Sequence, residues 1–245
     1  MGLRRGGTFT PPVQDFTPAD LPGLYVWLDA SDAGTLTIDS GTVSAWADRS
    51  GNARHASQGT TAIRPTLQAA GLNGLPTVRF DGVDDRMVLA GFTHLTTLTV
   101  AVVARPTNLS GFRALVGRTE DSPWRHNWVV GLDSAKHLLL YYNGSVYPRA
   151  GAADAVTVNT AYVFTSRLDS SPAAHLWQDG ELQNLAVDTI APSPANFGAG
   201  VLGASDGGTA SFWAGDISEV VITSGALSDE DVAALNAYLL SKWGI

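Results

Sequence analysis

Short apolar segments of four to eight residues follow one another from Leu24 to Thr223, separated by clusters of Gly, Asn, Asp, Ser and Pro. Within the segments the apolar residues recur at every second position, which is the period of a strand that buries one face. The segments are 24–28, 77–80, 97–104, 113–117, 127–132, 137–142, 161–168, 174–178, 201–204 and 216–223. This pattern predicts an all-β sandwich or barrel.

Two dipeptides predict tight turns between these segments. Asn143-Gly144 follows segment 137–142, and Asn-Gly is suited to the two positive φ angles of a type I′ turn. Asp179-Gly180 follows segment 174–178 in the same way. We therefore expect a β-hairpin at each dipeptide.

The period changes near the end of the chain. Ser228 is an N-cap residue, and the three acids that follow it suit the positive end of a helix dipole. The apolar residues beyond them fall on one helical stripe: Val232, Leu235, Leu239 and Trp243. The sequence predicts a single short C-terminal helix that packs on the sandwich.

Length and composition favour one domain. The chain has 245 residues, of which 44% are hydrophobic and 16% are charged, and it contains no cysteine. One sandwich can account for this length, and neither a disulfide nor a thiolate metal site can form. Residues 1–20 are rich in Gly and Pro and carry Arg4 and Arg5, so we predict a flexible N-terminal arm and a sandwich over 21–245.

The negative net charge of the chain disfavours two classes of binding partner. A formal net charge of −8 disfavours binding to nucleic acid and to anionic lipid, because both rely on cationic protein surface. We see neither a signal peptide nor an apolar stretch long enough to span a bilayer. We therefore expect no nucleic-acid partner and no membrane insertion.

Seven pieces of the chain, in order, resemble the concanavalin A-like lectin/glucanase superfamily in its laminin-G-like jelly-roll form. They are 21–32, 46–58, 76–89 (PTVRFDGVDDRMVL), 98–106, 115–118, 175–183 and 213–245. The resemblance implies a jelly-roll β-sandwich, and strand positions place Trp27, Trp46 and Trp177 in its core. The ending YLLSKWGI resembles domains of bacteriophage virion proteins. The resemblance thus implies a virion protein made in the host cytoplasm, as a capsid decoration, tail fibre, spike or other tail component.

Catalytic motifs are weak in this chain. The superfamily includes β-glucanases with paired acids on one strand, but no two of the four glutamates here lie within four residues of each other. Asp216 and Glu219 differ by an odd number, so in a regular strand they would point to opposite faces. GAGVLG at 198–203 lacks the strand and helix of a dinucleotide site and is better interpreted as a Gly-rich strand edge. We expect no enzymatic activity and no catalytic residues.

Calcium is a cofactor that the resemblance implies, because laminin-G-like domains often hold one ion near a sheet rim. The oxygen ligands available in Gly-containing turns are Asp48, Asn52, Asp81, Asp84 and Asp85. The alternative is that these side chains cap turns of their own backbone. Both interpretations stay open from the sequence.

Residues 120–149 form the best candidate for a carbohydrate site, because exposed aromatic rings stack on sugars while polar neighbours bind hydroxyls. Alternation directs Trp128, Val130 and Leu132 to the core, as it does Leu138, Leu140 and Tyr142. The remaining candidates are Trp124, Arg125, His126, Asn127, Tyr141 and Tyr147.

Three functions follow from these observations. The first is a non-catalytic surface protein that binds a host cell-surface glycan, and the second is a purely structural virion subunit. The third and least favoured is a glucanase-type hydrolase. In the first two, the arm would contact other virion proteins, and the chain would form a homo-oligomer.

Overall fold

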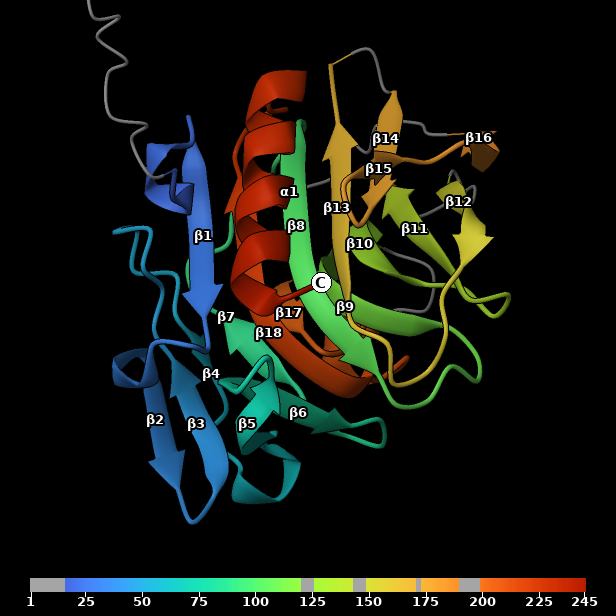
Figure 1. The fold of residues 1–245 in the computed structure, drawn as a ribbon. Coiled ribbons are helices and arrows are strands. Elements are labelled where there is room, and N and C mark those ends of the chain that lie inside the picture. Colours follow the sequence, from blue (N-terminus) through green and yellow to red (C-terminus); the bar gives the residue numbers. More distant parts are fainter. Residues whose placement is uncertain (1–15, 120–125, 143–148, 171–172, 190–198) are drawn as a thin grey trace, which may run out of the picture.

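Two antiparallel β-sheets pack face to face, and one helix lies on the outer side of one of them (Figure 1). This computed structural model describes residues 16–119, 126–142, 149–170, 173–189 and 199–245. The prediction of an all-β jelly-roll sandwich with one C-terminal helix is confirmed. No helix in these ranges is both long and apolar enough to cross a bilayer.

The sheet beneath the helix is called the back sheet. In spatial order it contains β1 (Leu24–Asp29), β18 (Ala214–Thr223), β8 (Leu98–Pro106), β13 (Tyr162–Leu168), β14 (Ala174–Gln178) and β15 (Glu181–Leu182). The first part of β18 also pairs with β6 (Leu75–Asp81), which pairs in turn with β5 (Thr66–Leu72). The Asp179-Gly180 turn joins β14 to β15 with positive φ at both residues, as expected.

The opposite sheet is called the front sheet. In spatial order it contains β7 (Met87–Leu89), β17 (Ala199–Leu202), β9 (Arg113–Thr119), β10 (His126–Leu132), β11 (His137–Tyr142), β12 (Arg149–Ala155) and β16 (Leu185–Thr189). Asn143-Gly144 lies outside the described residues, but β11 and β12 pair antiparallel on either side of it. Because β17 pairs with both β7 and β9, the expectation that GAGVLG forms a strand edge is wrong.

Short strands lie at one end of the two sheets: β2 (Leu36–Asp39), β3 (Thr42–Trp46) and β4 (Ala56–Ser57). The 3-10 turns are η1 (Pro18–Asp20), η2 (Ala33–Thr35), η3 (Thr61–Ile63) and η4 (Asp206–Gly208). Strand β4 pairs with β7 of the front sheet, and β3 pairs with β5 beside the back sheet. Residues 16–20, which the sequence assigns to the arm, take part in the fold: η1 has a capping box between Thr17 and Asp20.

The main core lies between the sheets. Trp46, Trp128 and Trp213 are completely buried there, together with Phe80 and Phe164 at 1% and 0% exposure. These rings fill the space between inward-facing aliphatic residues of both sheets. The burial of Trp46 confirms its predicted core position.

The helix α1 (Asp229–Trp243) forms a second core on the outer face of the back sheet. Ser228 Oγ accepts from the backbone N–H of Asp231 at 3.1 Å, which confirms the predicted cap. The helix ends at Trp243 and is followed by the C-cap residue Gly244, where φ is 67°. The predicted stripe is buried at 1% exposure or less in all four members: Val232, Leu235, Leu239 and Trp243.

Helix α1 lies over one row of residues that crosses the back sheet. The strand register places Trp27, Val221, Ala101, Thr165 and Trp177 side by side on β1, β18, β8, β13 and β14. Except for Thr165, these residues share a hydrophobic cluster with the helix stripe. The outer face of the back sheet is therefore used for internal packing, and the burial of Trp27 and Trp177 confirms two more predicted core residues.

Candidate functional site

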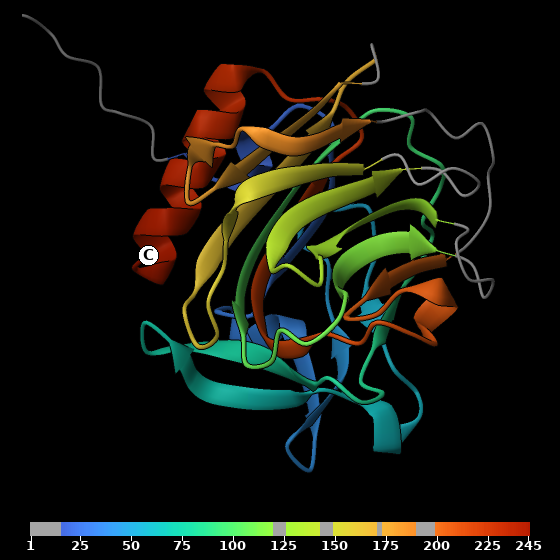
Figure 2. The same cartoon turned by 90° about the vertical axis from the view of Figure 1, so that its right-hand side faces the viewer.

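The front sheet presents the opposite outer face of the sandwich. Figure 2 shows α1 on one side of the molecule and the strands β10–β12 away from it. In the part of the chain that the structure describes, the only α-helix is the one on the back sheet. The two outer faces therefore differ: one carries a helix and the other does not.

Strand alternation in the front sheet separates core residues from outer ones. Trp128, Val130 and Leu132 of β10 are fully buried between the sheets, as are Leu138 and Leu140 of β11. This confirms the predicted inward direction of these five residues, and the side chain of Tyr142, the sixth, lies outside the described residues. On β10, Val129 and Gly131 lie between these core residues and belong to the outer face, because successive side chains of a strand alternate, and both are buried there.

One outer row can be followed across several strands by register. Val88 pairs with Val201, which pairs with Gly117, and Gly117 pairs with Val129. Directly paired residues share a face. Val88 is 43% exposed, whereas its neighbours in the sequence belong to the core, so the row lies on the outer face. Further along the row, Val201 and Val129 have no exposed surface.

The same register continues into the segment that carries the predicted carbohydrate site. The backbone of Tyr141 pairs with Val129 on one side and with Arg149 on the other. Trp124, Arg125 and Tyr147 lie outside the described residues, and so do the side chains of His126, Asn127 and Tyr141. The structure therefore places the strands of this site, and its six side chains stay a prediction.

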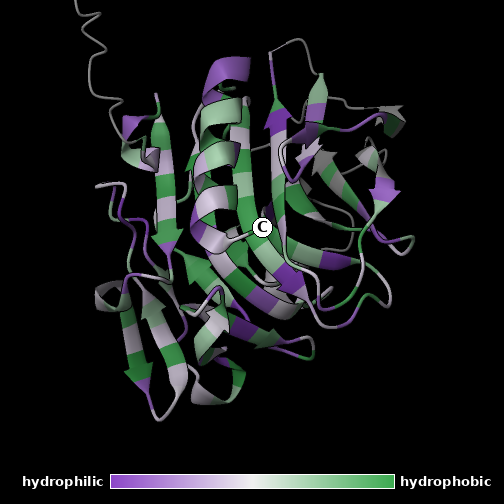
Figure 3. Ribbon diagram, in the orientation of Figure 1, coloured by the Kyte–Doolittle hydropathy of each residue, from purple (hydrophilic) through white to green (hydrophobic). Residues whose placement is uncertain are grey.

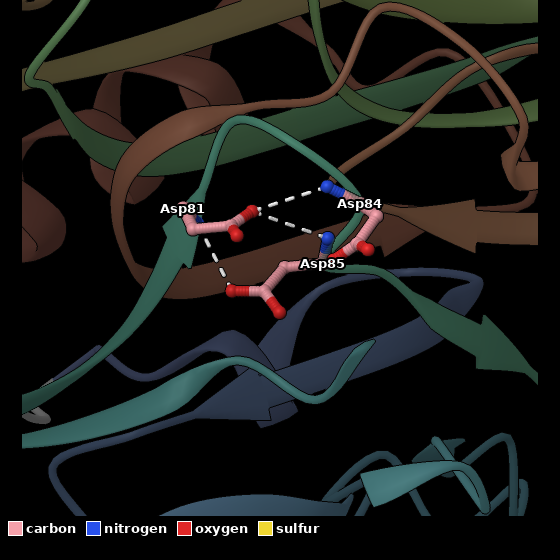
Figure 4. A group of neighbouring side chains, drawn as sticks. All are labelled: Asp81, Asp84 and Asp85. Carbon is pink, nitrogen blue, oxygen red and sulfur yellow. Dashed lines mark hydrogen bonds between the residues drawn. The ribbon is translucent and has the colours of Figure 1, made fainter. Parts of the chain in front are cut away.

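Three of the predicted calcium ligands come together at the end of β6. The carboxylate oxygens of Asp81, Asp84 and Asp85 lie within 4.8 Å of one another (Figure 4). Asp81 Oδ1 accepts from the backbone N–H groups of Val83, Asp84 and Asp85 at 2.8, 3.2 and 3.3 Å, and Asp85 Oδ2 accepts from that of Asp81 at 2.9 Å. These bonds close the turn on itself, with Gly82 at a φ of 79°.

The other two predicted ligands lie in a different loop, where they cover the open edge of β1. Asp48 Oδ1 accepts from the N–H of Trp27 at 2.9 Å. Asn52 Nδ2 donates to the carbonyl oxygens of Leu24 and Tyr25 at 2.9 and 3.2 Å. An uncovered strand edge is prone to pair with other chains, so both side chains have a structural role here.

The Asp81 cluster offers oxygen ligands of the kind that suit Ca²⁺. Burial raises the pKa of Asp85 to about 7, and the charges of Asp81 and Asp84 add to this effect. Among the described residues, no Lys or Arg side chain forms an ion pair with the three carboxylates. The donor set fits a hard cation, but turn capping accounts for the hydrogen bonds, and calcium stays a prediction.

Asp216 and Glu219 lie on the same face of β18, which corrects the expectation of opposite faces. The register of β18 against β8 shifts between Ile217 and Glu219, and this β-bulge interrupts the alternation. Ile217 and Val220 point into the main core, whereas both acids lie on the helix side. The expectation assumed a regular strand, and the sequence DISE gives no sign of the bulge.

Both acids are completely buried and bound by cations. Asp216 receives two hydrogen bonds from Arg79, at 2.7 and 3.0 Å, and two from Arg105, at 3.0 and 2.5 Å. Glu219 Oε2 receives hydrogen bonds from Lys242 Nζ and Trp243 Nε1, both at 2.7 Å. The two carboxylates are thus engaged within the protein.

A protein-family model for the concanavalin A-like lectin/glucanases superfamily matches residues 81–233. The chain belongs to this superfamily. The match covers more than half of the chain and begins at the Asp81 turn of β6. It confirms the resemblance inferred from the sequence pieces.

Solved structures share the fold at low identity. Trypanosoma rangeli sialidase with the inhibitor DANA has a TM-score of 0.59 and 13% identity, over 89% of this chain and 33% of that one. The same enzyme with 2,3-difluorosialic acid gives 0.61 and 14%, over 97% and 36%. The chain thus spans about a third of these sialidase chains. No curated protein matches the sequence.

A smaller structure is also similar. The carbohydrate-binding module CBM40 of Ruminococcus gnavus IT-sialidase, bound to α2,3-sialyllactose, has a TM-score of 0.48 and 17% identity. The similarity covers 57% of this chain and 82% of the module. At 13–14% identity the sialidase likenesses show the fold of this superfamily member and not its ligand.

Proposed function

We propose that this superfamily member is a non-catalytic carbohydrate-binding domain and that its ligand lies on the outer face of the front sheet, beside β10 and β11. The observation that carries the proposal is the position of α1. Because the helix packs over the back sheet, the outer face of the front sheet is the broad sheet surface without a helix among the described residues. Membership of a lectin-containing superfamily supports a carbohydrate as the ligand.

The strand register supports the location. Tyr141 pairs with Val129, a residue of the outer row, and Arg149 follows on the next strand. An aromatic residue next to a cation in the sheet is suited to a sugar, because the ring stacks on C–H groups while the guanidinium binds oxygen atoms. In the sequence, Trp124 precedes β10 and Tyr147 lies between β11 and β12.

The state of the acids supports a binding role and not hydrolysis. A glycosidase needs two carboxyl groups that flank the substrate bond. Asp216 and Glu219 share a face but have no exposed surface, and each is neutralised by neighbouring cations. Incubation with oligosaccharides should therefore release no product, and hydrolysis would contradict this part of the proposal.

Calorimetric titration with neutral, amino and sialylated oligosaccharides tests binding. We expect Tyr141→Ala and Trp124→Ala each to weaken a bound glycan about tenfold, since one stacking ring contributes on the order of 1 kcal/mol. Leu182→Ala is the control, because Leu182 is 60% exposed on β15 of the back sheet. No binding at millimolar ligand, or equal losses in all three variants, would overturn the proposal.

The virion setting depends on the resemblance of YLLSKWGI and stays a prediction, as do homo-oligomer formation and contact of the arm with other virion proteins. The alternative of a purely structural subunit predicts no glycan binding together with a stable oligomer. Sedimentation of the full chain beside the titration separates the two functions. A monomer that binds glycan favours the first function and excludes a structural role that requires an oligomer.

A further inference from the structure

The outward side of α1 is unusually apolar for a surface helix. Between the acidic first turn and Lys242, the helix carries no charged residue. The exposed side chains in this stretch are Ala233, Ala237 and Ser241. In Figure 3 the first turn is purple, whereas much of the helix below it is white to green. Surface helices normally carry charged or polar residues on this side.

A shallow groove of about 520 Å³ lies between Phe16 and this side of the helix. The groove is lined by Phe16, Thr17, Ala234, Ala237, Tyr238, Ser241 and Lys242. The Phe16 ring meets that of Tyr238 edge-on, with centroids 6.2 Å apart and planes at 70°. The rest of the α1 wall consists mainly of small side chains.

Lys242 and Thr17, at the rim of the groove, already have polar partners within the protein. Lys242 Nζ contacts Glu219 and Asp29 at 2.7 and 2.8 Å, on the inner side of the helix. Thr17 donates from both its N–H and its hydroxyl to Asp20. The groove therefore suits an apolar chain segment better than a polar ligand.

The chain supplies such a segment directly before Phe16. Residues 9–13 are Phe-Thr-Pro-Pro-Val, and Val13 precedes Phe16 by three positions. Three extended residues span about 10 Å, whereas Tyr238 and Ala234 are one helical turn apart, about 6 Å along the axis. A segment attached at the rim also has a high effective concentration at the groove.

The charges at the two ends also favour the N-terminal segment as the occupant of the groove. Arg4 and Arg5 precede the apolar segment, and α1 begins with Asp229, Glu230 and Asp231. Glu230 is exposed and forms no ion pair among the described residues. Ten residues lie between Arg5 and Phe16, which is ample for a distance of about 12 Å between Tyr238 and Glu230 along the helix.

We propose that residues 9–13 dock in the groove between Phe16 and α1 of the same molecule, and that Arg4 and Arg5 lie against the acidic first turn of α1. The docked segment covers the apolar side of the helix. The groove is on the back sheet, so this proposal does not depend on carbohydrate binding at the front sheet.

Cross-linking of the full chain tests the proposal, because the protein has no cysteine of its own. We expect the double variant Val13→Cys/Ala237→Cys to form an intramolecular disulfide under mild oxidation, and to migrate as a monomer on a non-reducing gel. Val13→Cys/Ala233→Cys is the control, since Ala233 is exposed on the same helix but does not line the groove. It should form the disulfide severalfold more slowly.

Two results would overturn the proposal. Equal rates for the two pairs would show that the segment has no preference for the groove. Disulfide-linked dimers would place the segment on a second copy of the chain.

Limited trypsin cleavage after Arg4 and Arg5 gives a second measurement without cysteines. Ala237→Glu should speed this cleavage because it puts a charge in the groove, whereas Ala233→Glu adds the same charge outside it. Both changes keep a good helix former at an exposed position. Equal cleavage of the two variants would contradict docking against Ala237.

Discussion

Lys242 Nζ lies 2.7 Å from Glu219 Oε2 and joins the end of α1 to the middle of β18. Glu219 has no exposed surface, and it also accepts from the indole N–H groups of Trp27 and Trp243 at 2.8 and 2.7 Å. Burial opposes the charge of Lys242, but the attraction of Glu219 and Asp29 outweighs burial and raises its pKa. One carboxylate thus connects β1, β18 and α1.

Removal of the cation should strongly destabilise the fold. Lys242→Met leaves two buried carboxyl groups, Glu219 and Asp29, without this cation, and breaking a buried pair from one side typically costs about 3–5 kcal/mol. The double variant Lys242→Met/Glu219→Gln should recover part of this loss, because it removes the charge as well. Denaturant unfolding of the three proteins measures the effect. A Lys242→Met protein as stable as the wild type would show that the pair contributes nothing.

The sequence predicts the strands that are rich in apolar residues and misses several that are not. Segments 137–142 and 161–168 are mostly apolar and appear as β11 and β13. Strand β2 is mostly exposed and β5 has only intermediate and exposed residues, so neither stands out as a buried apolar segment. Their pairing depends on neighbouring strands, which a local pattern does not reveal.

The clusters of charge could not be predicted because they depend on long-range contacts. Asp216 is more than one hundred residues from Arg79 and Arg105 in the sequence, and the three meet only because β6 and β8 flank β18. Asp81, Asp84 and Asp85, in contrast, lie in one turn, and the sequence alone brings them together. The DISE segment contains a β-bulge that its residue types do not predict.

The fold should tolerate the loss of one of the two arginines that bind Asp216, but not the loss of both. Arg79 and Arg105 each form two hydrogen bonds with this buried carboxylate, so one remaining cation still neutralises it. We expect Arg79→Met and Arg105→Met to cost on the order of 1 kcal/mol each and the double variant to cost at least 3 kcal/mol. Additive losses measured by urea unfolding would contradict shared neutralisation.

Stability should fall as pH rises from about 4 to about 7 because of Asp85. Its pKa is about 7 in the folded protein, against 3.8 for the ordinary carboxyl group. Over this interval the folded state holds a proton that the unfolded state has released, so the favourable contribution present at low pH is lost as pH rises. One unit corresponds to about 1.4 kcal/mol, so the upper limit is about 4 kcal/mol.

Asp85→Asn isolates this contribution, because asparagine keeps an oxygen for the N–H of Asp81 and cannot ionise. We expect the variant to gain stability relative to the wild type at pH 8 and to gain little at pH 4. Thermal unfolding at the two pH values measures the difference. If Asp85→Asn is more stable than the wild type by the same amount at pH 4 and at pH 8, Asp85 does not titrate in this range.

Calcium should leave the melting temperature unchanged if capping is the whole role of the Asp81 turn. Asp81 Oδ1 already accepts three backbone N–H groups, so a metal ion would compete with bonds that close the turn. The capping interpretation predicts equal melting temperatures in millimolar CaCl₂ and in EDTA at pH 8. A bound ion would instead stabilise the folded state in proportion to the logarithm of its concentration. A calcium-dependent rise in the wild type that is absent in Asp85→Asn would contradict the capping interpretation and establish the site.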